Sequence, residues 1–196
     1  IWGLDVARYG GDNSALCVRQ GNTVLELKSF QSMDLMQLCG AIKNRYDDCT
    51  ALERPQEILI DVIGLGSGVV DRLAEQNLPV RGINVAEAPA TKKNYLNLRA
   101  ELWFAIKDWL AQRDCRLPND DELVSELAAP IYKYTSSGKI KLESKEEMRK
   151  RGIKSPDKAD ALSLTMASSA ASFSGSMSFM GYNFRQPLKS KIIRIG

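Results

Sequence analysis

The sequence contains no histidine at all. This absence excludes Ser-His and Cys-His nucleophile pairs, imidazole general bases and histidine-ligated zinc sites. Cysteine is scarce, and its spacing forms no Cys-x-x-Cys pair, which indicates neither a zinc site nor a disulfide framework. Any hydrolytic chemistry must therefore rest on carboxylates, with lysine and a hard metal ion as helpers. The four cysteines are Cys17, Cys39, Cys49 and Cys115.

Long hydrophobic runs are also missing. No apolar segment is long enough to span a bilayer, and we find no signal peptide. Together with the unpaired cysteines, this favours a reducing compartment and no secretion. The length of 196 residues and the 44% hydrophobic content suit one domain with a sizeable core. Since the chain begins directly in a predicted strand without Met, we expect it to be part of a longer protein.

Charge is unevenly distributed along the chain, although the formal net charge is only +3. Residues 139–158 hold 8 basic and 4 acidic residues, and residues 171–196 hold 4 basic and none acidic. This pattern indicates either a surface for an anionic partner or a solvated surface followed by a basic tail. Composition alone leaves both interpretations open.

Strand and helix patterns alternate, which predicts a mixed α/β (α+β) fold. We expect residues 1–171 to form the domain and residues 172–196 a flexible basic tail. The first three predicted strands form an antiparallel meander, with a hairpin turn at Gly21 and Asn22. Strands are predicted at 1–7, 13–20, 22–31, 57–62 and 78–85, a hairpin at 131–143, and helices at 33–46, 69–76, 94–113, 121–128, 144–151 and 155–171.

Three aspartates lie where ordinary packing would not place a charge. Asp5 is in the first strand, Asp61 ends the buried "ILID" strand, and Asp160 lies between alanines one turn into a helix. Asp157 is three residues earlier on the same helix face. Ligand sites in such sheets gather at the carboxyl ends of strands, where converging carboxylates need a divalent cation such as Mg²⁺ or Mn²⁺. Two such ions would activate a water and stabilise the leaving oxygen of a phosphodiester.

Each acid also has a simpler interpretation. The charge of Asp157 would interact favourably with the positive N-terminal end of its helix, and Asp160 could pair with a lysine. Turn amides or Arg8 could satisfy Asp5, and Asp61 could cap the loop that follows it. The joint placement of the acids, more than any one of them, favours a metal site.

The glycine stretch "GLGSG" at 64–68 follows a strand and precedes a helix. It lacks the Gly-Lys-Ser/Thr ending of a phosphate-binding loop, and no Gly-x-Gly-x-x-Gly pattern fits it. We therefore interpret these glycines as a tight turn that allows close packing of helix and strand. The last predicted helix, at 155–171, has Ser155 as its expected N-cap and Pro156 in its first position.

Four segments together resemble the C-terminal nuclease domain of the large terminase subunit of tailed bacteriophages. They are "GLDVARYGGDNSAL" (3–16), "ILIDVIGLGSGVVDRL" (58–73), "NLRAELWFAIKDWL" (97–110) and "KSPDKADALSLTMA" (154–167). The resemblance implies a ribonuclease H-like fold, with a central mixed sheet, antiparallel first three strands and flanking helices. It also implies a metal-dependent endonuclease that cuts concatemeric double-stranded viral DNA during genome packaging, using two Mg²⁺ or Mn²⁺ ions.

The resemblance assigns roles to particular residues. Asp5, Asp61 and Asp160 match the catalytic metal ligands, and Asp157 lies where some members place a further ligand. In "NLRAELW" we expect core packing for Leu102 and Trp103 and no catalytic role for Arg99 or Glu101. A hairpin beside the active site is proposed to touch DNA in this family. The matching lysines here are Lys133, Lys139 and Lys141, to which Lys92 and Lys93 could add.

The implied partners are double-stranded DNA, the portal protein, the small terminase subunit and the ATPase domain of the same full-length chain, with no membrane. The implied location is the host cell cytoplasm. Three alternatives stay open: an actin-like ATPase or sugar kinase, another ribonuclease H-like enzyme of the resolvase or integrase type, and a non-catalytic docking module. The first needs a second related half, which the sequence does not contain.

Overall fold

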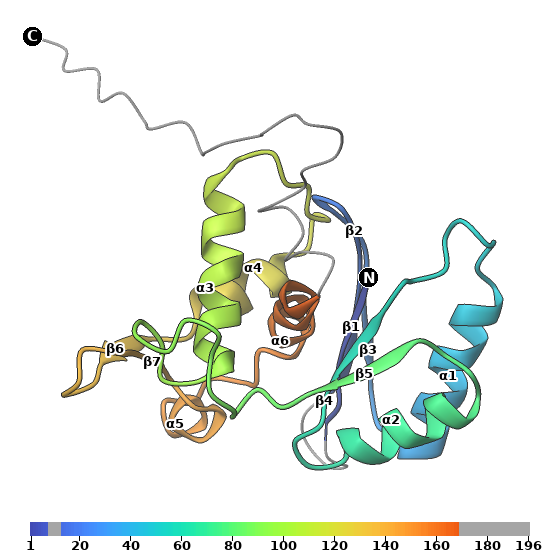
Figure 1. Cartoon of the computed structure of the whole chain (residues 1–196), viewed down its shortest axis with the longest axis horizontal. Helices are drawn as coiled ribbons and strands as arrows, with labels where there is room; N and C mark the ends of the chain where they lie inside the picture. Colours follow the sequence, from blue (N-terminus) through green and yellow to red (C-terminus); the bar gives the residue numbers. More distant parts are fainter. Residues whose placement is uncertain (8–12, 169–196) are drawn as a thin grey trace, which may run out of the picture.

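The computed structural model describes residues 1–7 and 13–168 (Figure 1). The predicted tail at 172–196 lies outside the described residues, as do Arg8 and the end of the helix predicted at 155–171. Within the described ranges, no helix is long and apolar enough to cross a membrane.

A five-stranded mixed sheet forms the centre of the molecule. The strand order is β3-β2-β1-β4-β5, and the first three strands in sequence pair antiparallel. Both β4 and β5 run parallel to β1, so the predicted meander and the mixed sheet are confirmed. The strands are β1 (Trp2–Asp5), β2 (Ser14–Gln20), β3 (Thr23–Phe30), β4 (Ile58–Asp61) and β5 (Val80–Ile83).

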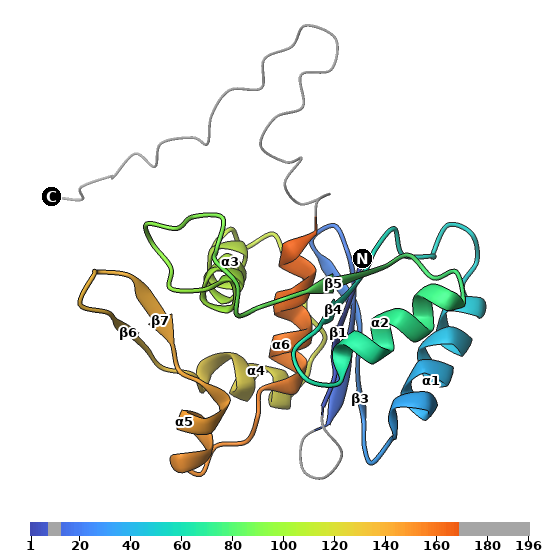
Figure 2. The same ribbon diagram turned by 60° about the horizontal axis from the view of Figure 1, so that its bottom comes forward.

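Helices cover both faces of this sheet (Figures 1 and 2). Side chains alternate between the faces along each strand. Leu4, Leu16 and Ile60 point to the face covered by α1 (Leu35–Asp47) and α2 (Gly66–Glu75), where they form the larger core cluster. The intervening residues of β1, β2 and β4 therefore point to the opposite face.

The opposite face packs against α6 (Asp157–Leu164), which continues as a 3-10 turn, η1 (Thr165–Ala167). Gly3 makes this approach possible, because a Cβ atom there would lie only 2.1 Å from the carbonyl oxygen of Ala161. Two further helices, α3 (Leu98–Ala111) and α4 (Asp121–Ala128), pack on the outer side of α6 (Figure 1).

A small hairpin and a short helix form an arm beside this layer (Figure 2). The hairpin consists of β6 (Tyr132–Tyr134) and β7 (Ile140–Leu142), as predicted, and α5 (Lys145–Lys150) follows it. A capping box starts α5, because the Ser144 side chain accepts the Glu147 N–H while the Glu147 carboxylate accepts the Ser144 N–H.

Apart from α4, the helix starts differ from the sequence-based prediction, and α3 begins at Leu98 instead of residue 94. Helix α2 already begins at Gly66, inside the glycine stretch. The position requires glycine, because a Cβ atom there would clash with the Asp61 carbonyl oxygen. The N-cap of α6 is Pro156, without a side-chain bond, so the prediction of Ser155 is wrong. The carboxylate of Glu126 on α4 instead accepts the N–H of Ala159 at 2.8 Å.

The contact at Gly3 leads to a stability prediction. We expect Gly3→Ala to lower the free energy of unfolding by about 1–3 kcal/mol, since the added methyl must push the α6 backbone away from β1. Gly40→Ala in α1 is the matched control, because nothing lies within 4 Å of its Cβ position. It should stabilise the helix by roughly 0.5–1 kcal/mol. Equal urea midpoints for the two variants would contradict this account of the α6 packing.

Candidate functional site

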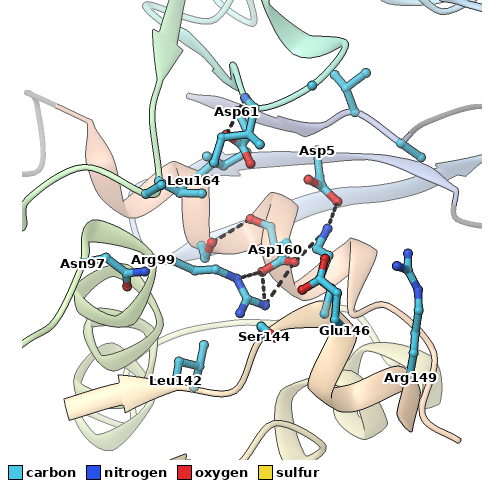
Figure 3. Close-up of a pocket in the computed structure, with 18 of the residues that line it drawn as sticks. Asp5, Asp61, Asn97, Arg99, Leu142, Ser144, Glu146, Arg149, Asp160 and Leu164 are labelled. Carbon is cyan, nitrogen blue, oxygen red and sulfur yellow. Dashed lines mark hydrogen bonds and ion pairs between the residues drawn. The ribbon is translucent and has the colours of Figure 1, made fainter. Parts of the chain in front are cut away.

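The carboxyl ends of β1 and β4 bring two of the predicted acids together. The parallel register pairs Leu4 with Ile60, so Asp5 and Asp61 follow at neighbouring strand ends. Both lie on the sheet face that α6 covers, because they alternate with the core residues of the other face. Asp160, in the first turn of α6, faces the same space (Figure 3). All three line one cavity of about 550 Å³.

A lysine that the sequence analysis did not single out lies between two of these acids. The Nζ atom of Lys145, at the start of α5, is 3.1 Å from Asp5 Oδ2 and 3.1 Å from Asp160 Oδ2. The two carboxylate side chains are only 6% and 8% exposed, whereas the lysine side chain is 30% exposed. The ammonium group therefore balances two buried charges from the solvent side of the site.

Helix α3 holds the other oxygen of Asp160. Its Oδ1 atom accepts hydrogen bonds from Arg99 Nε at 3.3 Å, Arg99 Nη2 at 3.1 Å and Trp103 Nε1 at 2.8 Å. Arg99 also donates from Nη1 to the Glu143 carbonyl oxygen at 2.8 Å, which fixes the guanidinium. The Oδ2 atom has fewer donors, because it meets only Arg99 Nη2 at 3.4 Å and Lys145 Nζ at 3.1 Å among the described residues.

Sequence reasoning missed this role of α3. Trp103 does lie in the core, as expected, but its indole N–H also binds Asp160. The available signal was the spacing of Arg99 and Trp103, because residues four apart share one face of a helix. Periodicity could not reveal that this face meets an aspartate of another helix.

The electrostatic environment shifts the pKa values of Asp5 and Asp160 in opposite directions. Burial raises the pKa of Asp5 to about 7, although Lys145 opposes the shift. Burial would also raise the pKa of Asp160, but Arg99, Lys145 and the Trp103 hydrogen bond together hold it below its ordinary value. The pKa of Lys145 is raised, because attraction to Asp160 and Asp5 outweighs the effect of its burial.

Asp61 combines the two interpretations that the sequence left open. Its Oδ1 atom accepts the Ile63 N–H at 3.1 Å, so it does cap the loop after β4. It also lines the cavity with Asp5 and Asp160. Burial raises the pKa of Asp61, and the Ile63 hydrogen bond partly offsets the shift.

Among the described residues, Asp157 lies outside the cavity lining but close enough for its charge to act on Asp5 and Lys145. Its Oδ2 atom accepts the Asn13 N–H at 3.0 Å. It neighbours Glu126, whose pKa is raised to about 7, mainly by burial and further by the charge of Asp157. The role of Asp157 as an additional ligand therefore stays a prediction.

The predicted DNA-contacting lysines are arranged along the arm. Lys141 lines the cavity, and Lys133 and Lys141 lie 3.4 and 3.6 Å from Glu147 Oε1. Lys139 is next to them on the hairpin. Lys92 and Lys93 are exposed in the loop before α3. This loop lies along β7, because the N–H of Leu96 donates to the Ile140 carbonyl oxygen at 2.9 Å.

The donor set suits a hard cation. In residues 1–7 and 13–168, no three acidic or cysteine side chains already stand close enough together to hold a metal ion. Two carboxylate oxygens nevertheless converge on the ammonium of Lys145, which acts as a stand-in cation, and Asp61 lines the same cavity. Oxygen ligands of this kind are those that Mg²⁺ and Mn²⁺ prefer.

The strand order, together with α6 packed on one face of the sheet, defines a ribonuclease H-like fold. No protein-family model and no curated protein sequence matches the chain. Solved structures do match. The nuclease domain of the large terminase subunit gp2 of bacterial virus Sf6, as a mutant with manganese and β-thujaplicinol, superposes with a TM-score of 0.74 at 21% identity. The match covers 85% of this chain and 87% of that domain.

Two more terminase nucleases share this architecture. The large terminase nuclease of thermophilic phage G20c, with bound magnesium, gives a TM-score of 0.62 at 16% identity, covering 83% of this chain and 77% of that one. The nuclease domain of Thermus phage P74-26 gives 0.60 at 13% identity, covering 85% and 78%. The chain therefore has the fold of phage large terminase nuclease domains, as the four sequence segments predicted.

The raised pKa of Asp5 predicts a pH-dependent effect on stability. A carboxyl group that ionises near pH 7 when folded, against 3.8 when unfolded, stabilises the folded state progressively less as the pH rises between these values. Asp5→Asn carries no charge to bury. In EDTA its melting temperature should exceed that of the wild type at pH 8 by about 2–4 °C or more.

This advantage should nearly disappear at pH 4, because the folded wild-type carboxyl is then protonated and the unfolded one, with a pKa of 3.8, is only about half ionised. Asp47→Asn, at an exposed ion pair with Lys43, is the control and should show little change between the two pH values. Thermal melting of the three proteins from pH 4 to pH 8 measures this. A lower melting temperature of Asp5→Asn than of the wild type at pH 8 would contradict the electrostatic account.

Proposed function

We propose that this chain is a metal-dependent endonuclease that cuts double-stranded concatemeric viral DNA during genome packaging. The observation that carries the proposal is the convergence of Asp5, Asp61 and Asp160 on one cavity, in a fold shared with terminase nucleases. Because the sequence contains no histidine, carboxylates and a metal ion are the chemistry available for phosphodiester hydrolysis here.

The proposed cofactors are two divalent cations, Mg²⁺ or Mn²⁺. Structures with the same fold hold manganese, magnesium, calcium or cobalt, which supports a divalent ion at this site. Asp5 and Asp160 would bind a divalent cation through their Oδ2 atoms, and Asp61 would contribute a carboxylate oxygen from the end of β4. A bound ion would supply a Lewis acid that activates water and stabilises the leaving oxygen.

Lys145 and a metal ion compete for the same oxygens in this arrangement. The ammonium group already contacts Asp5 Oδ2 and Asp160 Oδ2, so a cation can reach both only if the lysine moves aside. Arg99 and Trp103 would keep Asp160 oriented throughout, since they bind mainly its Oδ1 atom. We propose that Lys145 preserves the charge balance of the site whenever no metal is bound.

The basic arm offers a route for DNA to the acids. Lys141 lines the cavity, and Lys133, Lys139, Lys92 and Lys93 extend the positive surface around the hairpin. Lysine contacts to phosphates give binding that is independent of sequence. The portal protein, the small terminase subunit, an ATPase domain of the same chain and the host cytoplasm follow from the same proposal.

Incubation with supercoiled plasmid tests the proposed activity. The protein should nick and linearise the plasmid with Mn²⁺ or Mg²⁺, but not with EDTA. Asp61→Ala and Asp160→Ala should fold and cut at least about 100-fold more slowly, because each loses an oxygen ligand. Asp71→Ala, an exposed acid of α2, is the control and should cut normally.

Full cleavage by Asp61→Ala or Asp160→Ala would refute the assignment of the site. No cutting in any metal, together with no metal binding, would favour a non-catalytic docking module. A junction-resolving or integrase-type enzyme would instead cut branched DNA or strand ends in preference to linear duplex, so these substrates belong in the same assay.

The lysine between the acids predicts a second, thermodynamic result. Without metal, Lys145→Met should melt at a lower temperature than the wild type at pH 7.5, because Asp5 and Asp160 lose their shared cation. With Mn²⁺ its melting temperature should rise further than that of the wild type, because the metal no longer displaces an ammonium group.

Removal of this competitor should make Mn²⁺ bind roughly tenfold more tightly, which isothermal titration can measure. Lys150→Met, at the exposed end of α5, serves as the control and should match the wild type. An unchanged Mn²⁺ affinity in Lys145→Met would show that the lysine and the metal do not share a site.

A further inference from the structure

A row of aromatic rings runs from α3 onto the hairpin arm. The ring centroids of Tyr95 and Phe104 are 5.5 Å apart, those of Phe104 and Tyr132 5.2 Å, and those of Tyr132 and Tyr134 6.1 Å. The last two contacts are edge-to-face, at 86° and 80°. Such pairs hold neighbouring rings in fixed orientations.

The outer rings of this row are exposed to solvent. Tyr132 is 48% exposed and Tyr134 67%. Within the described part of the chain, the only ring that Tyr134 contacts is Tyr132, so most of its surface is open. Packing of the hairpin against α3 and the loop before it would account for the inner rings. It does not account for the large open surface of Tyr134 at the outer end of the row.

The hairpin has two chemically different faces. Tyr132 pairs with Leu142 and Tyr134 with Ile140, so these four side chains share one side, which we call the aromatic face. Lys133 pairs with Lys141 on the other side, where both lysines lie near Glu147 of α5. The lysine face borders the cavity through Lys141, and the aromatic face is directed toward α3.

Lysines lie along the hairpin that carries the outer rings, whereas acids lie near the inner end of the row. Burial raises the pKa of Tyr95 there, and the charges of Asp108 and Glu101 add to the shift. Residues 131–142 include three lysines and no acid. The Nζ atom of Lys107 on α3 lies 5.1 Å from the Phe104 centroid, next to the row. The loop that carries Lys92 and Lys93 lies along β7. An exposed aromatic surface on a hairpin that also carries lysines is complementary to a chain of phosphates with flat, unpaired bases.

We propose that the aromatic face binds unpaired bases of single-stranded DNA, with Tyr134 as the main stacking ring. This inference rests on the proposed nuclease function and adds a second element to its substrate: a frayed or unwound strand beside the duplex. Bases in an intact duplex are stacked on one another, so their faces cannot reach Tyr134. Stacking on a tyrosine is tolerant of sequence, because every base has a π-face.

Oligonucleotide binding tests the proposal without any cleavage. The probes are a fluorescently labelled dT20 strand and a blunt 20-base-pair duplex, titrated with the full chain in EDTA and followed by anisotropy. Tyr134→Leu keeps the apolar bulk but removes the π-face. It should weaken dT20 binding by roughly fivefold or more and change duplex binding by less than about twofold.

Three further variants sharpen the result. Tyr134→Phe keeps the ring and should bind dT20 like the wild type. Leu25→Ala removes an exposed apolar side chain from β3, 59% exposed and far from the arm in sequence, and should change neither affinity. Lys133→Ala should weaken both probes and reduce the salt dependence of binding, because lysines contact phosphates of either.

Unchanged dT20 affinity in Tyr134→Leu would overturn the proposal, and so would equal losses for dT20 and duplex. The melting temperature of Tyr134→Leu should equal that of the wild type, which shows that a change in affinity is not caused by unfolding. These outcomes are independent of the nuclease test. Plasmid cutting that depends on Asp61 can succeed while the stacking proposal fails, and metal-free dT20 binding through Tyr134 can persist in a protein that does not cut.

Discussion

The close crossing of α6 over β1 is the constraint on which the rest of the site depends. The carbonyl oxygen of Ala161 occupies the space that a side chain at Gly3 would need. Asp160, one residue earlier in the helix, is thereby held beside the carboxyl end of β1, where Asp5 lies. The parallel pairing of β1 with β4 then adds Asp61 from the neighbouring strand end. Backbone packing, not attraction between the acids, brings these like charges together.

Two different cations make that arrangement tolerable. Arg99 is a fixed partner, 13% exposed, and binds Asp160 from inside the helical layer together with Trp103. Lys145 is more exposed and lies on the cavity side, between Asp160 and Asp5. Under the proposed function, a guanidinium that stays and an ammonium that moves aside would give the site one permanent and one exchangeable counter-charge. This division would let the proposed metal site stay folded with or without its ion.

The hairpin arm presents different side chains on its two faces. Strand alternation gives Lys133 and Lys141 the opposite direction to the tyrosines, so one hairpin presents a cationic side near Glu147 and an aromatic side toward α3. Sequence identity to terminase nucleases of similar fold is only 13–21% over most of the chain. The fold thus depends on strand order, glycine contacts and core patterning, which many sequences can supply.

The sequence by itself determined the strands, the main helices and the placement of Asp5 and Asp61 at strand ends, because these follow from periodicity and local turn chemistry. Only the tertiary structure decided which partners the acids have. Lys145 is 140 residues from Asp5, and Arg99 and Trp103 are 61 and 57 residues from Asp160. The Glu126 cap on α6 and the separation of Asp157 from the cavity are equally non-local. Local patterns fix which way a side chain leaves its own helix or strand, whereas packing between elements fixes what it meets.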